Sequence, residues 1–236
     1  MSRTVSRLSA CLLLAPALLA ASIAQAHQAG DIIVRAGAVT VDPREDSSGI
    51  KHGALGDLGG KATLDSDTQL GLNFAYMVTD KVGIELLAAT PFSHDVGVAG
   101  LQGGLAGLNG KLGSIKHLPP TLSVVYYPLN NASAFKPYVG AGINYTWFFD
   151  EELSSAAKGK DFNGFSLDNS WGLAAQIGAD YMLSDNWMVN AQVRYIDIDT
   201  TGKTNLDGVG RLKVDVDVDP WVYMVGLGYK FCSRQQ

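Results

Sequence analysis

Aspartates at alternate positions are the residues of this chain best suited to bind a cation. Asp215, Asp217 and Asp219 are spaced two apart, as are Asp197 and Asp199 earlier in the chain. Side chains two apart in a strand share one face, so two adjacent strands would form an acidic collar. Carboxylates bind Ca²⁺ or Mg²⁺, which would bridge to lipopolysaccharide phosphates. A water-solvated rim is the simpler interpretation, and we predict neither a metal nor a cofactor.

Catalysis is the second kind of chemistry to consider. Among the four histidines, His94 and His117 are the two that the predicted strand ends would bring together. The sequence places no serine or acid beside them as a nucleophile or an orienting partner. We therefore predict that the protein is not an enzyme.

The segment that carries the second set of aspartates, residues 214–231, alternates with a period of two. Its odd positions present an aliphatic centre between aromatic residues, from Trp221 to Phe231. Ten steps span about 33 Å, or about 25 Å of height in a tilted strand. This height matches the apolar band of a transmembrane barrel between its aromatic girdles. The segment is therefore predicted to be a strand that faces lipid.

Seven earlier segments show the same alternation, which predicts an all-β fold: an eight-stranded antiparallel transmembrane β-barrel. The predicted strands are 31–41, 68–78, 82–88, 118–126, 138–149, 170–183, 187–195 and 214–231. Connections 79–81, 129–135 and 184–186 are short, whereas 42–66, 93–116, 150–168 and 200–213 are long. Short turns are typical of the periplasmic side and long loops of the extracellular side.

The N-terminal segment predicts the cellular location of the chain. Residues 1–26 combine Arg3 and Arg7, an apolar stretch and the sequence Ala24-Gln25-Ala26, as in a cleaved signal peptide. Residues 27–236 would then form the barrel, in the outer membrane of a Gram-negative bacterium. Its expected partners are outer-membrane lipid and lipopolysaccharide, together with periplasmic chaperones and the barrel-assembly machinery. An acidic chain without basic clusters does not favour nucleic acid.

Strand parity sorts the side chains into an inner and an outer set. The inner set is predicted to form a polar lumen, either as a satisfied core or as a selectivity lining: Arg35, Glu85, Asn144, Gln176, Asp180, Gln192 and Arg194. The outer set is predicted to form the aromatic girdles: Tyr145, Trp147, Trp171, Tyr181, Trp187, Tyr195, Trp221, Tyr223, Tyr229 and Phe231.

Near the extracellular mouth the inner face turns apolar. The predicted lining consists of Val39, Leu87, Val214, Val216, Val218 and Val222. Such a surface holds small apolar solutes by burial, although simple packing would require the same residues. Leu101, Leu105, Leu108 and Leu112 in the segment 93–116 have helical spacing, but seven glycines oppose a helix. We expect a flexible apolar flap over the mouth there.

Three prolines stand at the outer ends of the third and fourth predicted strands: Pro91, Pro119 and Pro120. Proline donates no backbone hydrogen bond, so it interrupts a strand ladder. One interpretation is a lateral gate through which an apolar solute leaves into the membrane. The other is that the prolines merely end the strands.

Several stretches resemble the OmpW family of outer-membrane proteins, and most closely its OprG type. They include Gln69-Leu70-Gly71-Leu72, Ala88-Ala89-Thr90-Pro91-Phe92, His117-Leu118-Pro119-Pro120-Thr121, Pro137-Tyr138-Val139-Gly140-Ala141-Gly142 and Asp219-Pro220-Trp221-Val222. The resemblance implies an eight-stranded barrel with a narrow hydrophobic channel, and some members serve as bacteriocin receptors. Barrels of this kind usually stop at the terminal aromatic, whereas here Cys232–Gln236 follow Phe231.

Together these observations predict an outer-membrane channel for the passive uptake of small hydrophobic molecules. The alternative is an interaction protein with a sealed bore, acting as a bacteriocin or phage receptor or as an adhesin.

Overall fold

The computed structural model describes residues 26–129 and 133–232. Residues 1–25 of the predicted signal peptide and residues 233–236 of the tail lie outside the described residues. In the described part of the chain, no helix has the length and apolar character needed to cross a membrane.

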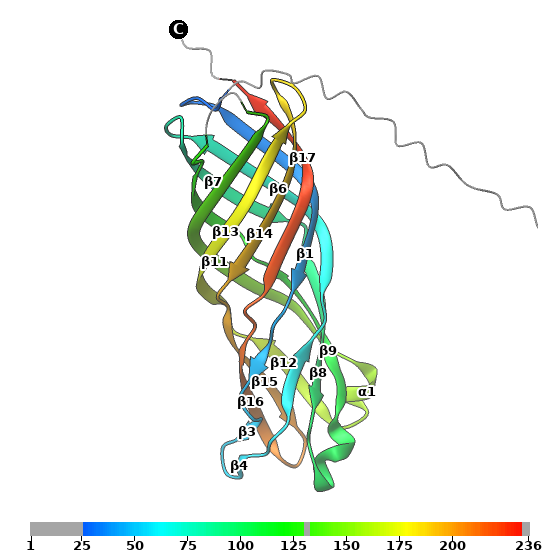
Figure 1. The fold of residues 1–236 in the computed structure, drawn as a ribbon. Helices are drawn as coiled ribbons and strands as arrows, with labels where there is room; N and C mark the ends of the chain where they lie inside the picture. Colours follow the sequence, from blue (N-terminus) through cyan, green and yellow to red (C-terminus); the bar gives the residue numbers. More distant parts are fainter. Residues whose placement is uncertain (1–25, 130–132, 233–236) are drawn as a thin grey trace, which may run out of the picture.

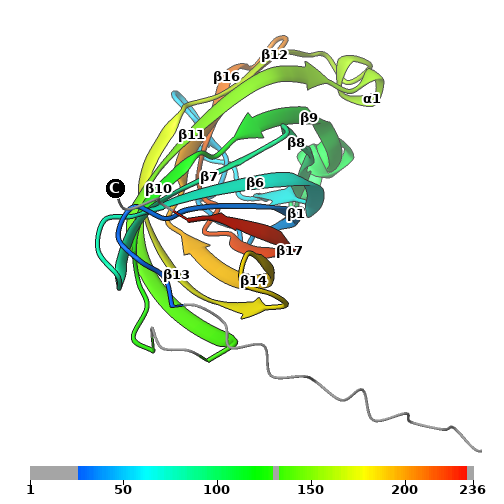
Figure 2. The same cartoon turned by 90° about the horizontal axis from the view of Figure 1, so that it is seen from above.

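Within the described residues, eight strands form a closed antiparallel barrel, which confirms the predicted fold. They are β1 (Ile32–Asp42), β6 (Asp67–Met77), β7 (Val82–Ala89), β10 (Thr121–Tyr126), β11 (Phe135–Leu153), β13 (Ser170–Met182), β14 (Trp187–Ile196) and β17 (Trp221–Phe231). The ring closes because β10 pairs with both β7 and β11. Figure 1 shows the barrel from the side. Figure 2, viewed from above, shows the strands following one another around the barrel axis.

The period-two alternation decides which side chains fill the barrel. In β17, Trp221, Val225 and Phe231 are exposed, whereas Val222 and Lys230 are buried. A barrel of eight strands is just wide enough for its own interior side chains, so the buried face is the inner one. Leucines, isoleucines and valines of the other strands are exposed in the same way on the outer wall.

One end of the barrel continues into an extension made of two small sheets (lower part of Figure 1). The first sheet contains β5 (Lys61–Leu64), β8 (Phe92–Ala99), β9 (Gly110–Leu118) and the outer part of β11. The second contains β2 (Asp46–Ser47), β3 (Lys51–His52), β4 (Gly56–Asp57), β12 (Phe162–Leu167), β15 (Asp199–Leu206) and β16 (Gly210–Asp217). A 3₁₀ helix, η1 (Gly103–Leu108), and a short helix, α1 (Ser155–Lys158), complete it.

The extension corrects three expectations drawn from the sequence. Segment 93–116, where we expected a flexible flap, forms a β-hairpin of β8 and β9 with η1 at its tip, because pairing satisfies its backbone despite the glycines. The predicted strand 118–126 begins only at Thr121, after Pro119 and Pro120. The predicted strand 214–231 is broken between β16 and β17, where Asp219 has a positive φ of 39°.

The interior is layered along the barrel axis. The barrel end opposite the extension is filled by an apolar cluster that includes Ile33, Met77, Tyr127, Tyr138 and Met188. Charged and amide side chains lie between this cluster and a second apolar cluster, which includes Val39, Leu87 and Val222. A third apolar cluster lies inside the extension. A polar layer therefore separates two apolar compartments.

Candidate solute pathway

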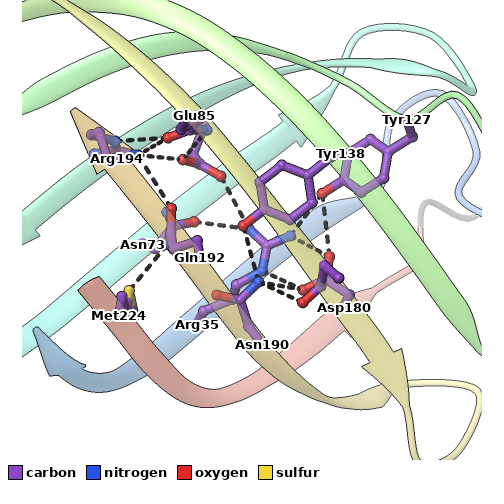
Figure 3. Close-up of polar contacts among 12 residues, drawn as sticks. Arg35, Asn73, Glu85, Tyr127, Tyr138, Asp180, Asn190, Gln192, Arg194 and Met224 are labelled. Atoms are coloured by element: carbon purple, nitrogen blue, oxygen red, sulfur yellow. Dashed lines mark hydrogen bonds and ion pairs between the residues drawn. The ribbon is translucent and has the colours of Figure 1, made fainter. Parts of the chain in front are cut away.

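Four charged side chains from four strands meet inside the barrel, and we call them the charge layer: Arg35 (β1), Glu85 (β7), Asp180 (β13) and Arg194 (β14). Arg35 binds Asp180 through two hydrogen bonds, Nε to Oδ1 at 2.9 Å and Nη2 to Oδ2 at 2.6 Å (Figure 3). Glu85 lies between the two arginines, 3.3 Å from Arg35 Nη1 and 2.8 Å from Arg194 Nη2. All four are at most 1% exposed, so each charge depends on its partners for compensation.

Amides and phenols complete the charge layer. Gln176 Nε2 donates to Glu85 Oε1 at 2.8 Å, and Asn73 Oδ1 accepts from Arg35 Nη1 at 2.9 Å. Tyr127 Oη accepts from Arg35 Nη2 at 2.7 Å, and Asn190 Nδ2 donates to Asp180 at 2.8 Å. This network fills the bore at the height of the layer, so a solute cannot pass straight down the axis without breaking it.

Not every residue of the predicted polar lumen belongs to this network. Asn144 lies apart from it, where its Nδ2 donates to the carbonyl oxygens of Pro119 and Pro120 at 3.0 and 3.2 Å. Gln192 does reach the network: its Oε1 accepts from Arg194 Nη2 at 3.4 Å, while its Nε2 lies 3.2 Å from the sulfur of Met224 in the second apolar cluster. Tyr127 and Tyr138 were not predicted as interior residues, although the inward parity of Tyr138 was a usable signal.

An apolar cavity lies inside the extension. Leucines of both sheets line it, together with Phe162, Phe165, Val214, Val216 and Val218. The other predicted lining residues lie deeper, in the second apolar cluster, between the extension and the charge layer: Val39, Leu87 and Val222. The cavity has the apolar lining of small-molecule pockets.

A narrow neck follows the cavity toward the barrel and shares Leu64 and Val218 with it. His94 and His117 lie at the neck, where their Nε2 atoms are 2.8 Å apart. Phe92 and Phe148 flank His117, with ring centroids at 5.4 and 5.7 Å. Burial and then the neighbouring His94 lower the pKa of His117 to about 3.

The wall beside the neck is interrupted between β6 and β8. The β6–β7 ladder ends at the pair Gly71–Ala89, followed by a bond from Thr90 N to Leu70 O, and pairing resumes only at Leu64–Val96. We call the intervening residues 65–69 and 91–95 the seam. Two aspartate side chains bridge it: Asp67 Oδ2 accepts from Ser93 N at 2.8 Å and Asp65 Oδ1 from Asp95 N at 2.6 Å.

The three prolines border the same region. The β7–β10 ladder ends at Leu87–Thr121, and the β8–β9 ladder begins at Phe92–His117. Pro91 lies between β7 and β8, and Pro119 and Pro120 lie between β9 and β10. The Pro120 carbonyl still accepts from Tyr145 N at 3.1 Å, so the boundary with β11 remains bonded. The wall is thus weakest on the side of β6 and β7.

The predicted girdle residues form aromatic contacts near both ends of the barrel wall. Tyr145–Trp171 and Tyr195–Trp221 lie at the extension end, with ring centroids 4.7 and 5.5 Å apart. Trp187, Tyr229 and Phe231 form a chain of contacts at the other end. Exposed aliphatic side chains occupy the wall between them. The remaining predicted members are exposed or partly exposed on the same wall: Trp147, Tyr181 and Tyr223.

The five aspartates of the predicted collar do not act as one group. Asp197, Asp199 and Asp219 bring carboxylate oxygens within 4.8 Å of one another. Asp215 instead pairs with Lys51 at 3.0 Å, which lowers the pKa of the Asp215 carboxyl. Partial burial and then the negative charges of Asp197, Asp217 and Asp219 raise the pKa of Asp199.

Comparison with known proteins places this architecture among outer-membrane barrels. Residues 28–231 match the sequence profile described as the OmpW family. Outer membrane protein W of Vibrio cholerae serotype O1 is 46% identical over 206 residues, which cover 87% of this chain and 91% of that protein. Outer membrane protein W of Escherichia coli strain K12 is 44% identical over 218 residues, covering 92% and 96%. The crystal structure of the outer membrane protein OprG from Pseudomonas aeruginosa superposes with a TM-score of 0.84 at 54% identity, covering 89% of this chain and all of that one.

Proposed function

This chain belongs to the OmpW family of outer-membrane proteins, and from its interior we propose that it is a channel for the passive uptake of small hydrophobic molecules. The observation that carries the proposal is the apolar cavity inside the extension. Burying apolar surface there contributes about 25 cal/mol per Å², whereas ions and sugars would lose hydration without compensation. The cavity therefore favours apolar solutes.

We propose that the solute leaves sideways, because the charge layer closes the barrel axis on the inner side of the cavity. Continuing down the axis would require the solute to separate Arg35 from Asp180, or Glu85 from Arg194, in a dry interior. The seam and the breaks at Pro91, Pro119 and Pro120 offer a route with few backbone hydrogen bonds to break. Lipid on the outer wall, including lipopolysaccharide at the rim, would receive the solute.

We assign the protein no catalytic role. His94 and His117 bond to each other, and His94 Nδ1 also bonds the carbonyl oxygen of Asp65 at 2.6 Å. Neither histidine is bonded to a serine, threonine or cysteine among the described residues. Periplasmic chaperones and the barrel-assembly machinery remain the expected partners during biogenesis.

Uptake by Gram-negative cells with and without this chain tests the proposal. The lipopolysaccharide leaflet slows apolar solutes, so cells that express the chain should take up naphthalene faster than cells that lack it. Uptake of arabinose should be the same in both. Equal naphthalene uptake in the two cell types would refute the channel.

The alternative function is an interaction protein with a sealed bore, such as a bacteriocin or phage receptor or an adhesin. The filled charge layer favours this reading, since it closes the axis of the barrel. Unchanged naphthalene uptake, combined with binding of a bacteriocin or phage to cells that carry the chain, would support it.

A further inference from the structure

The hydrogen-bond pattern of the histidine pair at the neck allows only one hydrogen between the two Nε2 atoms. The Asp65 carbonyl oxygen is an acceptor, so His94 Nδ1, at 2.6 Å, carries a proton. In a neutral ring, His94 Nε2 is then an acceptor, and His117 Nε2 must donate the hydrogen of the 2.8 Å contact. If both rings were imidazolium ions, two N–H donors and two positive charges would face each other at this distance. The contact cannot survive in that state.

The pair holds together the parts of the chain that border the seam. His94 lies on β8 and bonds residue 65 on the link between β5 and β6, while His117 lies on β9 opposite Phe92. Both rings are buried, at 1% and 4% exposure. The His94 Nδ1 bond to the carbonyl oxygen of residue 65 crosses the seam, whereas β8 and β9 stay paired through their backbones. Repulsion between two charged rings would displace His94 from the bond that crosses the seam.

The groups that face the pair come from every neighbouring element. The Asp65 Oδ1 atom lies 3.7 Å from His94 Nδ1, and the Asp67 carboxylate at the end of β6 favours the charged form of His117. The other neck side chains, from β1, β9, β11 and the segments around β14 and β17, are uncharged: Val41, Ile115, Thr146, Phe148, Ile198 and Pro220. Burial and the neighbouring His94 lower the pKa of His117 more than Asp67 raises it, so this pKa remains about 3.

We propose that the His94–His117 contact is a proton-sensitive latch that keeps the seam closed at neutral pH and releases it in acid. The proposal rests on the proposed function for its biological use, since it regulates the lateral exit, but the latch itself needs no solute. In the open seam His117 would be solvated and regain a pKa near 6.5. Each pH unit below about 6.5 then shifts the equilibrium up to about tenfold toward the open seam.

Hydrogen exchange of the seam amides tests the latch on the whole barrel in phosphatidylcholine nanodiscs without solute. After correction for intrinsic exchange rates, we expect opening at residues 92–95 to increase about 30-fold between pH 7 and pH 5. His117→Phe retains an aromatic ring between Phe92 and Phe148 but cannot be protonated, and it should reduce this increase to less than about threefold. His52→Gln, in β3 away from the neck, should behave like the unmodified protein.

An unchanged seam between pH 7 and pH 5 would overturn the proposal, and so would full pH dependence in His117→Phe. If that variant does not fold, ¹⁵N-histidine titration of the unmodified barrel decides instead. The latch predicts that His117 takes up its proton together with the exchange change, and a His117 that titrates while the seam stays closed contradicts it. A pH-dependent seam without naphthalene uptake would refute the channel and leave the latch standing.

Discussion

Asp67 and Ser93 lie opposite each other in the register shared by the pairs Gly71–Ala89 and Leu64–Val96, yet they are joined by a carboxylate rather than by backbone pairing. The Asp67 carboxylate takes the place of a backbone carbonyl and accepts a hydrogen bond from Ser93 N at 2.8 Å. Asp65 does the same for Asp95 at 2.6 Å. The wall thus satisfies its amides without a continuous backbone ladder. Opening the seam therefore requires breaking two bonds to side chains instead of several backbone hydrogen bonds.

A disulfide across this seam should block the exit. In a Cys232→Ser background, we expect Asp67→Cys with Ser93→Cys to abolish naphthalene uptake by cells, because the two strands can no longer part. Dithiothreitol should restore it. The matched control joins Phe74→Cys and Leu86→Cys, an exposed pair in the intact β6–β7 ladder, and should leave uptake unchanged. Full uptake through the oxidised seam would contradict the lateral route.

The charge layer should contribute strongly to stability. Arg35→Met removes the partner of Asp180 and leaves a carboxylate buried without compensation, which typically costs about 3–5 kcal/mol. Adding Asp180→Leu should recover part of this loss. Chemical unfolding of the barrel in lipid measures both effects. Arg44→Met serves as the control, because the Arg44 side chain is 61% exposed. Equal stability of Arg35→Met and Arg44→Met would show that the layer carries no such energy.

Local sequence predicts the barrel strands because the place of a residue in the alternation decides whether its side chain points into the barrel or outward. The alternation in 214–231 therefore placed Trp221 outside and Val222 inside without knowledge of their neighbours. The seam could not be predicted in this way, since it depends on how residues 65–69 meet residues 91–95 across the wall. The same limit applies to the tip strands: β8 alternates as Phe92, His94 and Val96, but the glycines that follow favoured a loop.

Asp199 should destabilise the extension at neutral pH. Its pKa is raised by partial burial and by Asp197, Asp217 and Asp219, so folding favours its protonated form. That stability is fully present below the ordinary value of 3.8 and is lost as pH rises through the higher folded value. Asp199→Asn should therefore raise the melting temperature at pH 7 and leave it nearly unchanged at pH 3. Asp207→Asn, at the β15–β16 turn, is a control. A melting temperature that rises equally at both pH values would argue against charge repulsion.

The apolar lining of the cavity should set the affinity for solutes. Val216 is buried on the cavity side of β16, and Asp217 is its exposed neighbour. In Val216→Asn an amide would enter a lining that offers it no polar partner, at a cost of about 1–3 kcal/mol when a solute displaces its water. We expect naphthalene uptake to fall between about fivefold and about 150-fold, since 1.4 kcal/mol is a factor of ten. Asp217→Asn introduces the same side chain on the outer face and should not change uptake. Because the two variants introduce the same amide on opposite faces of β16, equal uptake in both would mean that solutes do not pass through this cavity.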